Sequence, residues 1–336
     1  MKKIRFAVIG YGHIGKRHAA MIQQHEDCSL VAVCDTNSSL KADVPEGVSF
    51  FESLDELLQA GVEADVITIA TPNGLHATQA LKAVDAGHHV VVEKPMGLHK
   101  KECEAVIHNA LNSSKQLFCV MQNRYSPPSE WLKQVVSDGT LGDIYMVQVN
   151  CYWNRDERYY KKGSWHGTKE LDGGTLFTQF SHFIDLLYWV FGDITDIKAS
   201  FSSFNHQQLT EFEDSGVINF RFVKGGIGSI NFSTSVWDKN LESSMTVIGA
   251  NGSIKVGGQY MDKVEYCHIK GYEMPELKPT NPPNDYGPYK GSAANHHYVI
   301  QNVVDVLNGK ATITTNALEG LKVVDIIERI YDCKNK

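Results

Sequence analysis

Residues 4–15, Ile-Arg-Phe-Ala-Val-Ile-Gly-Tyr-Gly-His-Ile-Gly, join an apolar run to glycines at positions 10, 12 and 15. The run Ile4–Ile9 predicts a buried β-strand, and His13–Gln24 has the pattern of an amphipathic helix. At such a turn the first glycine permits the bend, the second lets the backbone approach a pyrophosphate, and the third allows close helix–strand packing. The stretch predicts a dinucleotide-binding loop at a helix N-terminus, with a plain glycine turn as the alternative. The expected cofactor contacts are Gly10, Tyr11, Gly12, His13, Ile14 and Gly15.

Asp35 comes at the end of the second predicted strand, twenty residues after Gly15. A carboxylate at this place accepts hydrogen bonds from the ribose hydroxyls and repels a 2′-phosphate, which favours NAD over NADP. The alternative is an aspartate that starts a turn before Thr36 and Asn37.

The first third of the chain repeats the alternation of strand and helix. Its Val- and Ile-rich runs show no polar alternation, which is typical of parallel strands buried on both faces. We therefore expect an α/β fold with a Rossmann doubly wound parallel sheet over residues 1–122. Strands are expected at Ile4–Ile9, Leu30–Cys34, Val66–Ala70, His89–Val92 and Leu117–Met121, and helices at His13–Gln24, Leu54–Ala60, His76–Ala86 and Lys100–Leu111.

Residues 123–336 have a different pattern, with longer alternating runs and glycine turns. They predict an α+β domain with a large, mostly antiparallel open sheet. A helix is expected near Gly174–Phe191, an irregular loop at Lys278–Lys290, and a helical tail near His297–Lys334 that can pack back on the first domain. The expected strands are Tyr145–Tyr152, Ile197–Phe204, Ser215–Phe222, Gly228–Ser235 and Ser244–Ile248.

Composition excludes several classes of protein. A net charge of −7 argues against a nucleic-acid partner, because phosphate binding needs concentrated Lys and Arg. Seven scattered cysteines without a C-x-x-C pair indicate reduced thiols and no metal site. No run approaches about 18 apolar residues, and the apolar run at the start is too short for a signal peptide, so a cytoplasmic protein without a membrane span is expected.

Two further polar groups follow predicted strands, where a parallel sheet has its ligand crevice. Thr71, Pro72 and Asn73, with His76 after them, are expected to face the cofactor, although Asn73 can also be read as a helix cap. Glu93 and Lys94 end the next strand and are also expected to contact the cofactor. A lysine beside a nicotinamide can polarise a substrate oxygen or take part in proton transfer, and a surface lysine in a turn is the alternative.

These motifs together resemble the glucose–fructose oxidoreductase/inositol dehydrogenase (Gfo/Idh/MocA) family. The likeness rests on the glycine loop, Thr71-Pro72-Asn73 with His76, Glu93-Lys94-Pro95, and Gly173-Gly174 followed by His182-Phe183-Ile184-Asp185, and it spans nearly the whole chain. It implies a Rossmann domain followed by an α+β domain whose open sheet forms homodimers or homotetramers. It also implies NAD-dependent hydride transfer from a sugar or polyol carbinol, with Lys94 and His182 as the catalytic residues.

One position departs from the family, which usually has an aspartate where this chain has Thr178. On one continuous helix Thr178 and His182 would be i,i+4 neighbours, with Gln179 three residues before His182. His182 alone can still accept a hydroxyl proton, since an ordinary imidazole pKa suits a base at neutral pH. A buried structural histidine is the alternative.

The stretch 172–182 resembles the branch of the family that oxidises C3 of UDP-N-acetylglucosamine or its uronate in bacterial surface-polysaccharide synthesis. In this hypothesis NAD takes the hydride, His182 takes the hydroxyl proton, and Lys94 stabilises the oxyanion. Residues 286–296 could hold a diphosphate, or could be a surface loop capped by Ser292. Asn123 is expected at the cofactor, and the expected substrate contacts are Lys94, Arg124, Thr178, Gln179, His182, Tyr286, Ser292, Asn295 and His296.

Two other functions remain open from the sequence. One is an NAD(P)-dependent dehydrogenase of a free sugar or polyol, and the other is a dinucleotide-sensing Rossmann protein without chemistry. The sequence also leaves open whether a group of aromatic residues lines the ligand site or belongs to a subunit interface. That group is Trp153, Tyr159, Tyr160, Trp165 and His166.

Overall fold

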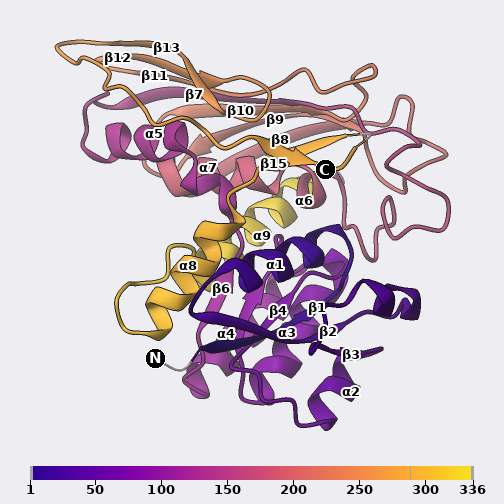
Figure 1. Cartoon of the computed structure of the whole chain (residues 1–336). Helices are drawn as coiled ribbons and strands as arrows, with labels where there is room; N and C mark the ends of the chain where they lie inside the picture. Colours follow the sequence, from indigo (N-terminus) through magenta and orange to yellow (C-terminus); the bar gives the residue numbers. More distant parts are fainter. Residues whose placement is uncertain (1–2, 288, 334–336) are drawn as a thin grey trace. The chain divides into compact units, whose positions relative to one another are not determined.

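The computed structural model describes residues 3–287 and 289–333. The chain divides into two compact units (Figure 1), which are described separately. Unit 1 comprises Met1–Met121 and His296–Val324, and unit 2 comprises Gln122–Asn295 and Asp325–Lys336. The first division falls one residue before the expected one, and the unit of the glycine loop also takes in a segment from near the end of the chain.

Unit 1 contains the expected parallel sheet, which is confirmed with the order β3-β2-β1-β4-β5-β6. The order reverses between β1 and β4, and ligands of such sheets bind beyond the strand ends at this point. The strands are β1 Ile4–Ile9, β2 Cys28–Cys34, β3 Ser49–Phe51, β4 Val66–Ile69, β5 His89–Val92 and β6 Leu117–Cys119. The helices are α1 His13–Gln24, α2 Leu54–Gln59, α3 His76–Asp85, α4 Lys100–Asn112 and α8 His296–Leu307, with 3-10 turns η1 Ser38–Asp43 and η2 Asn73–Leu75.

Unit 2 is built on a seven-stranded sheet of order β13-β12-β11-β7-β10-β9-β8, in which only the pair β7–β10 is parallel. The expected mostly antiparallel sheet is thus confirmed. Its strands are β7 Ile144–Tyr152, β8 Ile194–Ser202, β9 Ser215–Phe222, β10 Ile227–Ser233, β11 Glu242–Gly249, β12 Gly252–Gly257 and β13 Lys263–Ile269. The other elements are η3 Gln122–Tyr125, α5 Pro127–Ser137, α6 Thr175–Thr178, α7 Ser181–Phe191 and the hairpin of β14 Pro283–Asp285 with β15 Lys290–Ala293.

Three expectations for this part of the chain are wrong. The helix near Gly174–Phe191 is two helices, because the backbone leaves helical angles at Phe180 (φ −115°, ψ 5°). The helical tail is α8 followed by α9 Ala317–Asp332; Gly309, just beyond α8, has a positive φ of 71° that suits glycine and stops the helix. The segment Lys278–Lys290 is not irregular throughout, since β14 lies within it. Lys334, where the tail was expected to end, lies outside the described residues.

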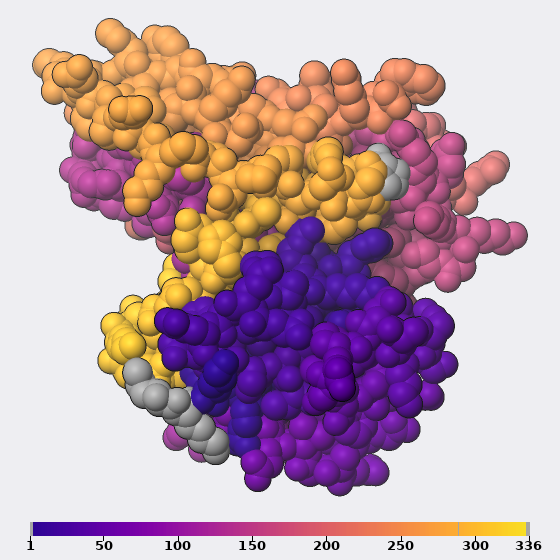
Figure 2. Space-filling model, in the orientation of Figure 1, coloured from indigo at the N-terminus to yellow at the C-terminus, as the bar shows by residue number. Residues whose placement is uncertain are grey.

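Helix α8 belongs to unit 1 and packs against α1. Figure 2 shows yellow atoms of this late segment directly beside indigo atoms from the start of the chain. This packing brings His296, the first residue of α8, to the core of unit 1. Among the described residues, no helix is long and apolar enough to cross a membrane.

Candidate active site

The glycine loop joins β1 to α1, and its three glycines differ in why a side chain is excluded or tolerated there. Gly10 has φ of 86°, and a Cβ on Gly15 would lie 1.7 Å from the carbonyl oxygen of Gly10. A Cβ on Gly12 would meet nothing within 4 Å. Two glycines are therefore required by the backbone itself, whereas Gly12 leaves open space at the start of α1. No side chain caps α1 and its first turn holds no acidic residue, so this end suits the pyrophosphate of NAD.

Asp35 is fixed in direct contact with this loop. Its Oδ2 accepts the backbone N–H of Tyr11 at 2.7 Å, and its Oδ1 accepts the backbone N–H of Asn37 at 2.9 Å. The second contact is the turn considered as an alternative, and the first holds the carboxylate beside the cofactor loop. Both interpretations of Asp35 therefore apply together, and the geometry suits a ribose hydroxyl.

His76 was expected at the cofactor, but its ring is used elsewhere. It is buried, with Nδ1 2.7 Å from the carbonyl oxygen of Pro95 and Nε2 2.8 Å from that of Thr71. Burial lowers the pKa of His76, against the effect of these two carbonyls. The ring thus ties the loop after β4 to the loop after β5. Asn73 is the first residue of η2 and Pro72 precedes it, so Asn73 does not cap the turn.

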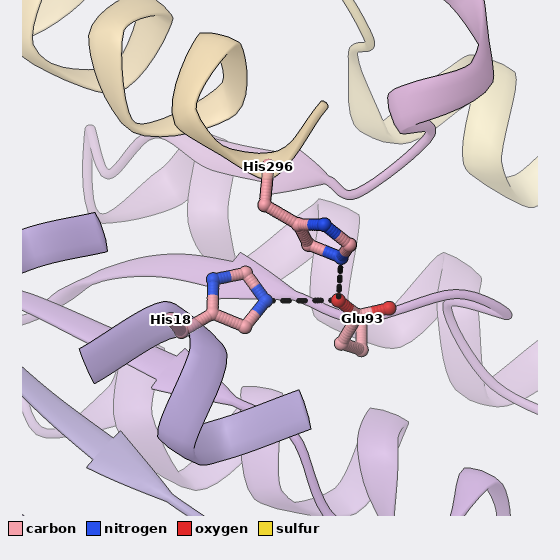
Figure 3. A group of neighbouring side chains, drawn as sticks. All are labelled: His18, Glu93 and His296. Carbon is pink, nitrogen blue, oxygen red and sulfur yellow. Dashed lines mark hydrogen bonds and ion pairs between the residues drawn. The ribbon is translucent and has the colours of Figure 1, made fainter. Parts of the chain in front are cut away.

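Glu93 follows β5 and forms a buried cluster with His18 and His296 (Figure 3). Its Oε1 is 2.8 Å from Nε2 of His18 and 3.4 Å from Nε2 of His296. Burial alone would raise the pKa of Glu93, but the two imidazole rings outweigh it and hold the pKa well below its usual range. The other oxygen, Oε2, accepts the backbone N–H of Lys94 at 3.1 Å. The ionised carboxylate therefore fixes the backbone at Lys94.

The same three residues have ligand atoms within 4.8 Å of one another, as a metal centre would require. Two observations argue for a hydrogen-bonded cluster instead. His18 and Glu93 are in direct hydrogen-bond contact, and Nδ1 of neither histidine has a partner among the described residues. Histidines that bind a metal almost always donate this second nitrogen to another group. His296, expected at the substrate, is thus a buried neighbour of Glu93, and His18 was not identified from the sequence.

In unit 2, His182 lies in the first turn of α7 and is buried. Its Nε2 is 3.2 Å from Nε2 of Gln122, which also donates to the Ser292 hydroxyl at 3.1 Å. Asn295 donates to the Gln122 carbonyl oxygen at 3.2 Å. Because an amide nitrogen only donates, Nε2 of His182 is here an acceptor, the state that a general base requires. Three expected residues thus meet around Gln122, which was not predicted.

Thr178 ends α6, so it does not share a continuous helix with His182 as expected. Its hydroxyl donates to the carbonyl oxygen of Asp172 at 3.0 Å and also to Oδ1 of the same residue. Asp172 is fully buried, and its Oδ2 accepts the N–H of Gly167 at 2.8 Å. A carboxylate absent from position 178 is therefore present beside it.

Arg124 was expected to bind substrate, but its guanidinium is paired inside unit 2. Nε and Nη2 lie 2.9 and 2.5 Å from the two carboxylate oxygens of Asp185, and both side chains are 1% exposed. This corrects the expected role. The neighbouring Asn123 is also buried, and neither polar atom of its side chain has a partner among the described residues. The cofactor contact expected of Asn123 stays a prediction.

The segment 286–296 was expected to hold a diphosphate or to form a surface loop. Several of its side chains instead contact other residues of unit 2. The Tyr286 ring stacks on that of Tyr289 at 5.2 Å, and Lys290 pairs with Asp285 across the hairpin. Ser292 is buried beside Gln122. Pro288 lies outside the described residues.

The chain is similar to known proteins over nearly its whole length. Residues 4–121 match the GFO/IDH/MocA oxidoreductase family with an NAD-binding Rossmann fold, and residues 130–255 match a GFO/IDH/MocA C-terminal domain. The WlbA dehydrogenase of Bordetella pertussis, solved with NADH and UDP-GlcNAcA, is 34% identical, with 99% of this chain and 97% of that chain covered and a TM-score of 0.86. WlbA of Chromobacterium violaceum, in a complex with the same two molecules, is 32% identical over 100% and 94%, with a TM-score of 0.88. Glucose-6-phosphate 3-dehydrogenase of Bacillus subtilis is 25% identical over 85% of this chain and 84% of its own.

Proposed function

Since the chain belongs to the GFO/IDH/MocA family and is an NAD-dependent sugar oxidoreductase, we propose that it oxidises C3 of a UDP-N-acetylhexosamine or its uronate. The observation that carries the proposal is the whole-chain similarity to two dehydrogenases solved with NADH and UDP-GlcNAcA. The product, a 3-keto nucleotide sugar, fits a step in bacterial surface-polysaccharide synthesis.

In this proposal one group of residues binds NAD, and His182 and Lys94 act on the C3 hydroxyl. The glycine loop and Asp35 hold NAD, which supplies the hydride acceptor when bound, and Asn123 offers a further contact. His182 takes the proton of the C3 hydroxyl at Nε2, where the substrate hydroxyl replaces the hydrogen bond from Gln122. Lys94 stabilises the oxygen as negative charge develops, since the loop that carries it is fixed on both sides by Glu93 and His76.

The test is a substrate panel, with the product analysed by mass spectrometry. We expect UDP-N-acetylglucosamine or its uronate to lose two hydrogens in the presence of NAD, even if NADH stays bound and escapes an absorbance assay. 2-Oxoglutarate is included to recycle bound NADH. Turnover of glucose, glucose 6-phosphate or inositol, with none of the nucleotide sugars, would point to the free-sugar alternative. The B. subtilis relative makes glucose 6-phosphate the informative comparison.

The sheet of unit 2 also supports the expected assembly into dimers or tetramers. Ile227, Met146 and Ile248 are direct cross-strand neighbours on β10, β7 and β11. They are 46%, 37% and 40% exposed, whereas the residues next to them in the chain that face the core are buried. An exposed apolar row on a sheet is suited to self-association.

We expect Met146→Glu to weaken self-association at least about 30-fold, because a central interface position would have to bury a charge. Analytical ultracentrifugation across a concentration series measures this. Leu111→Glu is the matched control, since Leu111 is 74% exposed on α4 of unit 1. An unchanged association constant in Met146→Glu would exclude this face as the interface.

A further inference from the structure

Arg155 is a buried cation in unit 2 that has no carboxylate partner among the described residues. It lies three residues beyond the end of β7 and is 2% exposed. Its guanidinium carbon is 4.7 Å from the ring centre of Trp153, 5.3 Å from that of Tyr159 and 5.0 Å from that of Tyr289. Across the described residues no acid comes within ion-pair distance of it, whereas Arg124 in the same unit is paired with Asp185.

Within the described part of the chain, every hydrogen bond of the Arg155 guanidinium goes to a neutral acceptor. Nε donates to Oε1 of Gln179 at 3.0 Å, and Nη2 donates to the Lys290 carbonyl oxygen at 3.1 Å. Nη1 donates to the Asn154 carbonyl oxygen at 2.6 Å and to Oδ1 of Asn240 at 3.2 Å. A guanidinium has five N–H groups, so one of the two on Nη2 is left over. Neutral dipoles and ring faces offset a buried positive charge only in part.

Gln179 supplies a second donor without an acceptor. Its Oε1 is used by Arg155, while its Nε2 is buried and has no partner within the described part of the chain. The side chain is 4% exposed and comes three residues before His182. A buried N–H without an acceptor is unfavourable, unless a ligand or water supplies the missing oxygen. Arg155 and Gln179 are therefore hydrogen-bonded neighbours, each with a buried N–H that finds no acceptor among the described residues.

We propose that Arg155 and Gln179 bind an oxyanion of the nucleotide-sugar substrate. The inference rests on the proposed function and deepens it. The oxyanion has two possible sources in a nucleotide sugar, the C6 carboxylate of a uronate or the diphosphate. In this proposal the ring faces of Trp153 and Tyr159 hold the Arg155 guanidinium in place.

The experiment compares wild type with two variants. Arg155→Gln removes the positive charge, and Arg155→Lys keeps the charge but lacks the planar N–H donors of the guanidinium. Arg158→Gln is the matched control, because Arg158 is half-exposed and pairs with Asp156. For each protein, kcat/KM is measured with UDP-N-acetylglucosamine and with its uronate. Inhibition by UDP and by free N-acetylglucosaminuronate then separates the diphosphate from the carboxylate. NAD affinity and the thermal midpoint report whether the fold is intact.

For a carboxylate, Arg155→Gln should lower kcat/KM at least about 30-fold more on the uronate than on the neutral sugar, and Arg155→Lys should fall in between. If Arg155 binds the diphosphate, KM should rise by the same factor for both substrates, and inhibition by UDP should weaken. If the substrate ratio and both inhibition constants stay within about twofold of wild type, Arg155 is only a structural cation and the proposal is overturned. Wild type that oxidises neither nucleotide sugar would instead remove the proposed function, and binding of UDP and the uronate would still test Arg155.

Discussion

Replacing Lys94 by alanine should lower kcat about 1,000-fold, while NAD affinity and stability stay close to wild type. A positioned group that stabilises charge or transfers a proton contributes roughly 100- to 10,000-fold to a rate. The Lys94 side chain is half-buried, and the residues on either side of it in the chain are buried. The loss should therefore appear in turnover, measured by single-turnover formation of the 3-keto product.

Lys101→Ala serves as the control, because Lys101 is an exposed lysine on α4, seven residues further along the chain. It should leave kcat unchanged. NAD binding by fluorescence titration shows whether the Lys94 variant keeps its cofactor loop. A Lys94→Ala enzyme that retains activity within about threefold of wild type would contradict the assigned role.

The features that the sequence predicted best are local. β1, the glycine loop and α1 begin and end as expected, because the apolar run, the glycines and the helical period each act within a few residues. β13 was missed because it is largely exposed at the edge of its sheet, and the step between Tyr266 and Cys267 interrupts its short alternation. The break before α7 was missed for a different reason. Nothing in Thr178-Gln179-Phe180 forbids a helix, and the turn is set by contacts such as that of Thr178 with Asp172.

Pairings across long stretches of chain could not be predicted. His18 and Glu93 are 75 residues apart, and His296 comes later still, on a helix that packs on α1. His296 has the residue type of a ligand-binding side chain, and only the fold shows that it lies against Glu93. Arg155 had no motif to mark it, since its significance is that no acid among the described residues lies within ion-pair distance of its guanidinium. Motifs thus predicted the glycine loop and its fold, whereas the charge balance of buried side chains required the tertiary structure.

Replacing Arg124 by methionine should lower the free energy of unfolding by about 3–5 kcal/mol, because it removes the cation that binds both oxygens of the buried Asp185 carboxylate. Both oxygens of that carboxylate are bound by Arg124, and both side chains are 1% exposed. Urea denaturation followed by fluorescence measures the change. The sequence alone favoured a substrate contact, and that role would raise KM and leave stability unchanged.

The double variant Arg124→Met/Asp185→Leu separates the two roles. Removing both charges together avoids a buried carboxylate without this cation, so most of the lost stability should return, as for other buried pairs replaced by apolar residues. If the double variant is stable and its KM matches wild type, the pair only holds η3 against α7, which carry Arg124 and Asp185. If KM rises in the stable double variant, Arg124 also acts on the substrate, and the assignment to a purely structural pair fails.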